Sequence, residues 1–257
     1  MEYKNQIYTK DGAVATIMFN RPERRNSHDI ESYTEFQHAM RAALGDSAIR
    51  VIVLTGAGTA WSAGRDIKFT NRATPQEIAQ YQSILGQVYD LVRTCDKPVI
   101  ARINGPITGG TNRLAFECCD VSIAVNTARF ARREINTGLS GGAAHFHAIG
   151  RNRCIDMNLT GRFISADEAQ QWGLLTRSVP PDKLDEVVQD YIEMLVKLPP
   201  MGVAITKRCI NFALESAGYS INRQFQGAAT RVLWTSEDRN EAERAFIEKR
   251  TGVYKGK

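Results

Sequence analysis

Short apolar runs and helical periodicities alternate along the first half of the chain. The apolar runs lie at residues 13–19, 51–54, 99–103 and 121–125. Runs of this length, ended by glycine, proline or polar residues, predict strands that are buried in a sheet. Apolar residues spaced by three and four predict helices over 28–44 and 75–95, the second with Thr74 as its N-cap and Pro75 in its first turn. Strands separated by helices predict parallel pairing and an α/β fold class.

The second half of the chain has a different pattern, because only helical periodicity follows residue 180. The predicted helices cover 183–197, 201–215 and 224–249. We therefore expect an α/β core over residues 1–198, followed by a helical region over residues 199–257. The core is expected to hold any active site, because the glycine-bearing strand ends all lie in it.

Composition and charge exclude several classes of protein. The 257 residues are 43% hydrophobic, and 33 basic against 28 acidic residues give a net charge of +5. This is ordinary for a globular protein, and a chain of this length needs no disulfide or metal to stabilise its core. Five cysteines without a C-x-x-C pair predict neither a zinc site nor a disulfide framework. The chain shows no signal peptide and no apolar stretch of membrane-spanning length, so we expect a cytoplasmic protein.

Two glycine-bearing strand ends are candidates for chemistry. The first is 60–68 and the second is 104–115, where a predicted strand passes through Gly109 and Gly110 into a helix. Small residues let a ligand approach the backbone, and two such loops could aim two N–H groups at one developing oxyanion. The alternative is that these glycines only form turns. Neither loop matches a nucleotide-binding fingerprint, and no G-x-S-x-G elbow of a hydrolase is present.

The motifs of the chain, taken in order, resemble those of the enoyl-CoA hydratase/isomerase (crotonase) superfamily. They are Asn20-Arg21-Pro22, Ser62-Ala63-Gly64-Arg65-Asp66-Ile67, Lys97-Pro98-Val99-Ile100-Ala101, Asn104-Gly105, Gly109-Gly110, Cys119-Asp120, Ala128-Arg129-Phe130, Leu159-Thr160-Gly161-Arg162, Gly173-Leu174 and Ser236-Glu237-Asp238. The resemblance covers nearly the whole chain. It implies a crotonase-like spiral of ββα units, with C-terminal helices that support a homotrimer or a dimer of trimers.

The resemblance also implies the substrate and the catalytic backbone groups. The substrate would be an acyl-CoA thioester, whose carbonyl oxygen accepts hydrogen bonds from the N–H groups of Ala63 and Gly110. Such donors stabilise an enolate, and removal of one typically costs about 10²–10³-fold in rate. Coenzyme A would enter as part of the substrate, so no cofactor and no metal is expected. The acyl pocket is expected in the region 69–92.

Residues near the two loops would bind the coenzyme A portion. The resemblance places them at Arg24, Arg25, Ser62, Ala63, Asp66, Ile67, Gly109 and Gly110. Arginine recognises phosphate through charge-assisted hydrogen bonds, although a solvated basic turn at Arg24 and Arg25 is an equal alternative. A phosphate-bearing small molecule accounts for the net charge as well as nucleic acid would, so no nucleic-acid partner is predicted.

The acid–base residues depart from the pattern that the resemblance implies. Hydratases of this family use two glutamates, and this chain has Glu134 at one of the two positions but Arg113 at the other. If Arg113 points inward, its charge should weaken Glu134 as a base. If it points outward, Glu134 is a lone acid/base group. The segment from Gly138 to Gly150 is also shorter than expected, and it brings His145 and His147 nearby.

These observations leave several functions open. Hydration or dehydration of an enoyl-CoA with Glu134 as acid/base is the main prediction. A single-glutamate enoyl-CoA isomerase is the second. The third is C–C bond cleavage or decarboxylation, in which Arg113 would bind a substrate carboxylate. A non-catalytic CoA- or RNA-binding protein is the alternative from another class.

Overall fold

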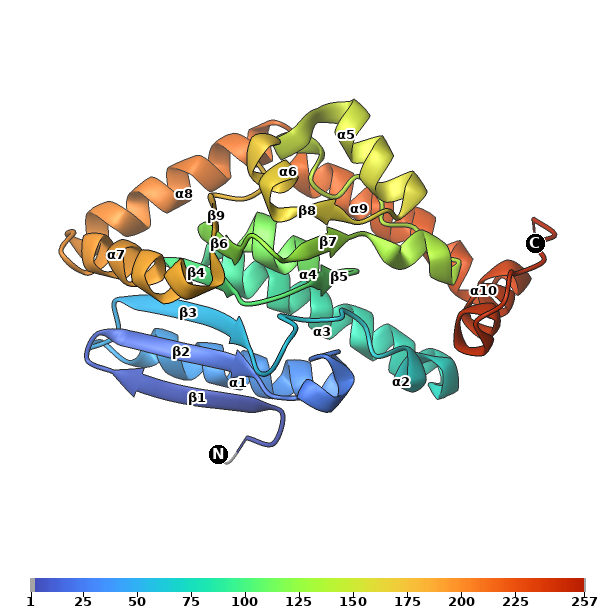
Figure 1. Ribbon diagram of the computed structural model, residues 1–257, viewed down its shortest axis with the longest axis horizontal. Helices are drawn as coiled ribbons and strands as arrows, with labels where there is room; N and C mark the ends of the chain where they lie inside the picture. Colours follow the sequence, from blue (N-terminus) through green and yellow to red (C-terminus); the bar gives the residue numbers. More distant parts are fainter. Residues whose placement is uncertain (1–2, 257) are drawn as a thin grey trace.

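Six strands form the main sheet, in the order β1-β2-β3-β4-β6-β9 (Figure 1). The computed structural model describes residues 3–256. The strands are β1 (Gln6–Asp11), β2 (Val14–Phe19), β3 (Val51–Gly56), β4 (Val99–Ile103), β6 (Val121–Val125) and β9 (Arg177–Val179). β1 runs antiparallel to β2, and all other neighbours in this sheet are parallel. The prediction of an α/β fold is confirmed.

A second, smaller sheet lies beside the first and consists of very short strands. These are β5 (Ile107–Thr108), β7 (Arg129–Ala131) and β8 (Ile164–Ser165). β5 pairs with β7 in parallel, and β7 pairs with β8 antiparallel. A single bridge from Ser62 to Ile107 connects the first glycine loop to this sheet. The two loops that the sequence singles out are therefore tied together by backbone pairing.

Ten α-helices and several tighter turns connect or follow the strands. The helices are α1 (Ile30–Gly45), α2 (Ile67–Arg72), α3 (Pro75–Thr94), α4 (Thr111–Arg113), α5 (Phe146–Thr160), α6 (Ala166–Gln171), α7 (Leu184–Val196), α8 (Pro200–Ser216), α9 (Tyr219–Arg231) and α10 (Glu237–Glu248). Thr74 caps α3, with its hydroxyl accepting from the N–H of Glu77, as predicted. No helix within residues 3–256 has both the length and the apolar character needed to cross a membrane.

The prediction of one helix over 224–249 is wrong. The chain forms α9 and α10 instead, separated by a 3-10 turn at Val232–Thr235. Ser236 starts α10, because its hydroxyl accepts from the N–H of Arg239 at 3.0 Å. The break lets α10 pack against the turn that carries Glu134, whereas α8 lies at the opposite end of the molecule (Figure 1). The boundary at residue 198 between core and helical region stays a prediction, and α8 begins at Pro200.

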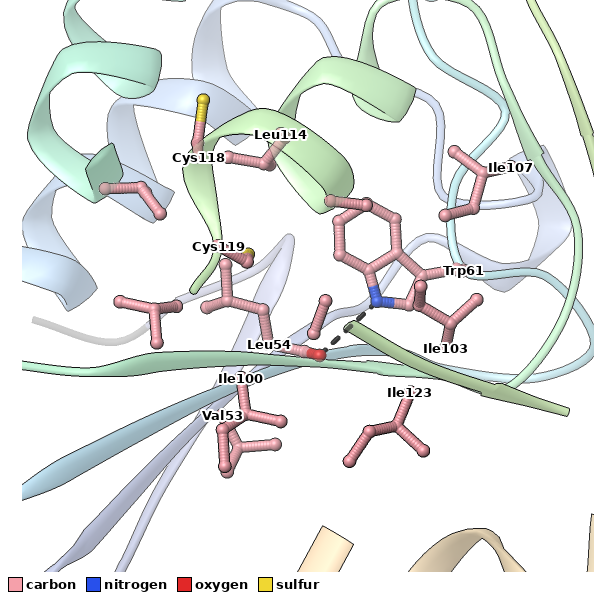
Figure 2. Packing of buried hydrophobic residues seen from close by; sticks show 14 of the residues in the cluster. Val53, Leu54, Trp61, Ile100, Ile103, Ile107, Leu114, Cys118, Cys119 and Ile123 are labelled. Atoms are coloured by element: carbon pink, nitrogen blue, oxygen red, sulfur yellow. Dashed lines mark hydrogen bonds between the residues drawn. The ribbon is translucent and has the colours of Figure 1, made fainter. Parts of the chain in front are cut away.

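A fully buried tryptophan fixes the first glycine loop to the core (Figure 2). The indole nitrogen of Trp61 donates to the carbonyl of Leu54 at 3.3 Å. Its ring also packs edge-on against Phe19, with the centroids 5.0 Å apart. Burial of a side chain this large stabilises the fold by several kcal/mol, on the order of 3–5 by the cost of truncating it. The loop that follows Trp61 therefore starts from a rigid point.

The Asn20-Arg21-Pro22 motif and Asn26 form a second anchor for the same loop. The side chain of Asn26 donates to the carbonyls of Ala57 and Ala60, each at 2.8 Å, and its Oδ1 accepts from the N–H of Arg21 at 2.9 Å. Asn26 has a positive φ of 55°, a conformation that asparagine tolerates better than most residues. Because the buried side-chain amide of Asn26 bonds only to backbone groups, it fixes the segment around Arg21 relative to the segment 57–60.

Candidate active site

A cavity of about 780 Å³ opens between the two glycine loops, α3, α9 and the turn after β7. Its lining includes most of the residues that the sequence predicts for the site. These are Arg24, Arg25, Ala63, Asp66, Ile67, Gly109, Gly110, Arg113 and Glu134. The volume suits a ligand of coenzyme size, since small-molecule sites commonly measure about 300–1,000 Å³.

The two glycine loops touch at Gly64 and Gly109. A Cβ atom built on Gly64 would lie 2.5 Å from the carbonyl oxygen of Thr108, and Gly64 has a φ of +80°. Only glycine fits this position, both because of the close approach and because of the backbone conformation. The N–H of Thr108 also donates to the carbonyl of Ser62 at 3.0 Å. The loops are therefore held side by side, as an oxyanion hole requires.

The predicted pair of oxyanion donors needs one correction. The N–H of Ala63 donates to the carbonyl of Arg25 at 2.8 Å, so it is already used within the protein. The next unbonded amide in that loop is the N–H of Arg65, which has no acceptor within residues 3–256. The N–H of Gly110 has none in this range either. The bridge between Arg65 and His28 uses the carbonyl of Gly64 as acceptor and the N–H of Asp66 as donor, and it leaves the N–H of Arg65 unbonded. The available donors are therefore those of Arg65 and Gly110.

Glu134 lies beside the second glycine loop. It is the second residue of a 3-10 turn (Arg133–Thr137), and its Oε1 is 4.0 Å from where a Cβ of Gly109 would lie. Its Oε2 is buried and has no hydrogen-bond partner in the described part of the chain. A buried carboxylate oxygen without a partner has unused acceptor capacity toward the cavity. Glu134 is not a surface carboxylate, because its side chain is only 17% exposed.

Arg132, which sequence reasoning missed, holds this carboxylate. Its Nη2 lies 2.9 Å from Oε1 of Glu134 and also donates to the carbonyl of Gly141 at 3.0 Å. Its Nη1 donates to the carbonyl of Gly109 at 3.0 Å. One buried guanidinium thus ties together the second glycine loop, Glu134 and the shortened glycine segment. The adjacent pair of arginines before Glu134 was the only signal, and nothing in it indicated which arginine turns inward.

Arg113 adopts neither of the two orientations considered from the sequence. It lines the cavity, but its Nε pairs with Oε2 of Glu117 at 3.1 Å, and its Nη2 donates to Oε1 of Gln226 at 3.1 Å. The pair with Glu117 spans four residues, which is the spacing at which helical side chains meet. The segment Leu114–Cys118 is a π-turn, a feature often found at functional sites. Glu134 is therefore paired with Arg132 and not with Arg113.

Glu117 is a buried carboxylate whose bonds are all made within the protein. Besides Arg113 it accepts from the hydroxyl of Tyr219 at 2.8 Å and lies 3.0 Å from Nδ1 of His145. Burial opposes ionisation, but the charge of Arg113 and the hydrogen bonds outweigh it and lower the pKa of Glu117 below its usual value. Burial lowers the pKa of His145, so this imidazole is neutral at pH 7. His145 therefore supports Glu117, and it is positioned there by a backbone φ of +68°.

Residues predicted for the coenzyme A portion line the cavity, with one exception. Oδ2 of Asp66 accepts from Arg21 at 3.0 Å and from Arg24 at 2.8 Å, and Asp66 also caps α2. Burial tends to raise the pKa of Asp66. The hydrogen bonds from Arg24 and from the N–H of Phe69 outweigh this effect, so the pKa of Asp66 lies below its usual value. Arg25 and Ile67 line the cavity.

Ser62 is the exception, because it does not reach the cavity. Its side chain is fully buried, its hydroxyl donates to the carbonyl of Asn26 at 2.7 Å, and it accepts from the N–H of Gly64 at 3.1 Å. Both contacts shape the loop and leave the hydroxyl no free position toward a ligand. The prediction that Ser62 binds substrate is therefore not supported by the structure, and its role is to hold the loop that carries Arg65.

Helix α3 forms part of the cavity wall, and it lies in the region 69–92 where the acyl pocket is expected. Tyr81, Leu85 and Tyr89 line the cavity there, and the hydroxyl of Tyr89 donates to the carbonyl of Gly110 at 2.8 Å.

Within residues 3–256, no three His, Cys, Asp or Glu side chains come close enough to hold a metal ion.

Comparisons with known proteins identify the family of the chain. The family model described as "Enoyl-CoA hydratase/isomerase" matches residues 9–257. A short-chain-enoyl-CoA hydratase of Clostridium acetobutylicum is 30% identical, over 97% of each chain. A crotonyl-CoA hydratase of Syntrophomonas wolfei is 29% identical, again over 97% of each chain. A solved enoyl-CoA hydratase of Mycobacterium avium subsp. paratuberculosis superposes with a TM-score of 0.86 at 28% identity and covers 99% of this chain and 100% of that one. The chain has the crotonase fold and belongs to the enoyl-CoA hydratase/isomerase family.

Proposed function

We propose that the chain is an acyl-CoA enzyme that hydrates a 2-enoyl-CoA, or dehydrates the corresponding 3-hydroxyacyl-CoA, through an enolate-like transition state. The observation that carries this proposal is the cavity itself. It presents the unbonded N–H groups of Arg65 and Gly110 together with the carboxylate of Glu134. The relatives named enoyl-CoA hydratase at about 30% identity support the same reaction.

The two amides would act on the thioester oxygen. When a nucleophile adds to C3 of the conjugated thioester, negative charge develops on that oxygen, and two preorganised donors stabilise it more than they stabilise the ground state. Arg132 fixes the peptide that carries the N–H of Gly110, because it bonds to the carbonyl of Gly109 in the same peptide, and Tyr89 fixes the peptide that follows. The close contact between Gly64 and Thr108 fixes the other loop. The donors therefore need little reorganisation during the reaction.

Glu134 would handle the protons. In hydration, its carboxylate takes a proton from water as the water oxygen bonds to C3, and C2 of the enolate then receives a proton. The unpartnered Oε2 of Glu134 is the atom that would accept the proton. Arg132 holds the other oxygen and so leaves Oε2 directed to the reaction. Arg113 supplies no second carboxylate, so Glu134 carries both the base and the acid role.

One observation favours a second candidate reaction, the isomerisation of a 3-enoyl-CoA to a 2-enoyl-CoA. A single carboxylate suffices for that reaction, because it removes a proton from C2 and returns it to C4. The pairing of Arg113 with Glu117 leaves Glu134 as that single carboxylate. Carbon–carbon cleavage or decarboxylation stays a prediction.

The coenzyme A portion would bind at the cavity mouth, where Arg24 and Arg25 offer donors to phosphate. Coenzyme A is then part of the substrate and not a resident cofactor. The proposal also includes a cytoplasmic location and a homotrimer or dimer of trimers. Exposed apolar side chains on α8 and α9 support assembly, since Phe212, Ile221 and Phe225 are each more than 70% exposed.

Absorbance of the conjugated enoyl thioester tests the proposal. The protein is offered a 2-enoyl-CoA and a 3-enoyl-CoA in separate assays: hydration lowers the absorbance of the first, and isomerisation raises that of the second. Glu134→Gln should reduce turnover by about 10²–10⁴-fold. Glu186→Gln, a matched change at an exposed carboxylate on α7, should leave it unchanged. No turnover of either thioester, or full activity in Glu134→Gln, would overturn the proposal. Binding of RNA that weakens steeply with salt would instead support the non-catalytic alternative.

A further inference from the structure

The acyl end of the cavity carries an excess of hydrogen-bond donors. Three polar side chains line the wall there, namely Arg113 at the end of α4 and Arg223 and Gln226 on α9. A simple alkyl chain would be served by an apolar wall. The presence of two guanidinium groups and an amide at this position therefore needs a chemical reason.

The two guanidinium groups both lie near one tyrosine ring. The Cζ atom of Arg113 is 5.8 Å from the ring centroid of Tyr89, and that of Arg223 is 6.0 Å from the same centroid. Tyr89 in turn bonds to the carbonyl of Gly110, the residue that supplies an oxyanion donor. The guanidinium groups thus lie about one side chain away from where the thioester carbonyl is expected.

Several donor atoms of these side chains have no acceptor in the part of the chain that the structure describes. Arg113 uses Nε for Glu117 and Nη2 for Gln226, which leaves Nη1. Arg223 uses Nη1 for Asp90, at 2.6 Å, which leaves Nε and Nη2. Gln226 uses only its oxygen, which leaves the two N–H bonds of its amide. The unused groups are all donors, so the complementary ligand is an acceptor.

Nearby carboxylates do not fill this role. Glu117 already accepts from Arg113 and Tyr219 and lies behind Arg113, in a smaller cavity of about 220 Å³. Asp90 lies at the surface with its side chain 57% exposed, where water screens its charge. A guanidinium group matches a carboxylate in geometry, because its parallel N–H bonds meet both oxygens.

We propose that the acyl chain of the substrate ends in a carboxylate, so that the substrate is the coenzyme A thioester of a dicarboxylic acid, held by Arg113, Arg223 and Gln226. This inference rests on the proposed function and narrows its substrate class. The carboxylate accepts from the donors that the protein leaves unused. A methyl group in the same place would exclude water from those donors without accepting a hydrogen bond from them. Sites built for polar groups reject apolar analogues strongly for this reason.

Binding of saturated thioesters tests the inference without turnover. Glutaryl-CoA and valeryl-CoA have five acyl carbons each and differ only in a terminal carboxylate against a terminal methyl group. Isothermal titration calorimetry with the full chain should show glutaryl-CoA binding at least tenfold more tightly than valeryl-CoA. Equal affinities, or tighter binding of valeryl-CoA, would overturn the inference and leave the proposed function standing. Failure of both thioesters to bind would overturn the two together.

Variants assign the effect to the guanidinium groups. Arg223→Gln should reduce the preference for glutaryl-CoA at least fivefold and leave the affinity for valeryl-CoA within twofold. Arg113→Gln should do the same, but it also leaves Glu117 without its cation, so its fold is checked first by circular dichroism. Arg208→Gln, a matched change at an exposed arginine on α8 that pairs with Asp96, should change neither affinity. An unchanged preference in folded Arg223→Gln and Arg113→Gln would overturn the assignment.

Discussion

Arg132 and Glu134 form a buried ion pair with 2.9 Å between Nη2 and Oε1, and the same guanidinium group bonds to the carbonyls of Gly109 and Gly141. The candidate base is thus oriented relative to the oxyanion loop by one side chain. Because Arg132 occupies only Oε1, the other carboxylate oxygen stays available. Arg132 acts through Glu134 and the two glycine segments that it bonds, so we assign it as a positioning residue.

Arg132→Met should lower kcat by about 10–100-fold and change KM little, because misplacement of a catalytic group by an ångström has effects of this size. Removal of one partner from a buried ion pair should also lower the free energy of unfolding by about 3–5 kcal/mol. Arg132→Lys should not restore kcat, because one ammonium group cannot reproduce the forked geometry of the three contacts. Steady-state kinetics and urea denaturation provide both readouts. A rise in KM at constant kcat would instead assign Arg132 to substrate binding.

The C-terminal helix α10 is connected to the first glycine loop through Glu243. This carboxylate is completely buried and pairs with Arg65 at 2.7 Å and with Arg239 at 2.7 Å. Arg65 also supplies one of the two proposed oxyanion donors. Glu243→Gln should therefore lower the free energy of unfolding by about 3–5 kcal/mol and should reduce kcat as well.

Glu248→Gln is the matched control on the same helix. Glu248 is half exposed and pairs only with Arg250, so its loss should cost less than about 1 kcal/mol. Equal effects of the two substitutions on stability and on kcat would show that Glu243 does not support the oxyanion loop.

Tyr89→Phe tests how Gly110 is held through its carbonyl group. The substitution keeps the ring and removes only the hydroxyl that donates to the carbonyl of Gly110 at 2.8 Å. The free energy of unfolding should fall by about 1 kcal/mol, the usual value of one hydrogen bond. The bonded carbonyl lies in the peptide that directly follows the proposed N–H donor of Gly110, so loss of the contact should loosen this residue and lower kcat severalfold. An unchanged kcat together with a lowered stability would separate the two roles and argue against a catalytic contribution of this contact.

The parallel sheet was predictable because its strands are continuous apolar runs with clear polar ends. The predicted strands at 99–103 and 121–125 have the observed bounds. The strands β5 and β8 contain two residues each, so they carry no periodic pattern and could not be predicted. The break between α9 and α10 was also missed, because Val232–Thr235 continues the helical spacing and only the cap at Ser236 reveals the boundary.

The candidate site was predictable in its position but not in its contacts. The glycine motifs located both loops, and Glu134 and Gly110 line the cavity as expected. Which amide is unbonded depends on long-range partners, and the contact of Ala63 with Arg25 cannot be inferred from spacing. The choice of Arg132 over Arg113 as the partner of Glu134 depends likewise on side-chain directions. The pair of Arg113 with Glu117 was the exception, because its spacing of four residues was visible in the sequence.

Acid should destabilise the fold through His28. This imidazole is buried against Tyr33, with ring centroids 4.5 Å apart, and its Nε2 has no partner within residues 3–256. Burial, with a smaller effect of the charge of Arg21, lowers the pKa of His28 from 6.5 to about 3. Above pH 6.5 the imidazole is neutral in both the folded and unfolded chain. As the pH falls from 6.5 toward 3, only the unfolded chain gains a proton, so stability is lost in this window.

At pH 5 the loss from His28 should be about 2 kcal/mol relative to pH 7.5. Urea denaturation across this range checks the value. His28→Phe removes the titrating group and should flatten the dependence, whereas His38→Gln, at an exposed imidazole, should not. His145 adds to the loss in the same direction, since its pKa is also lowered by burial. A free energy of unfolding that stays constant between pH 7.5 and pH 5 would contradict a buried neutral His28.

Isotope-edited infrared spectroscopy of a bound thioester tests the central claim most directly. Valeryl-CoA and glutaryl-CoA are prepared with ¹²C and ¹³C at the thioester carbonyl, and the difference spectrum isolates that one stretching band. If the N–H groups of Arg65 and Gly110 both donate to the thioester oxygen, the band of the tighter-binding thioester should move to lower frequency on binding. A bound thioester whose carbonyl band stays at its frequency in water would contradict an oxyanion hole in this cavity.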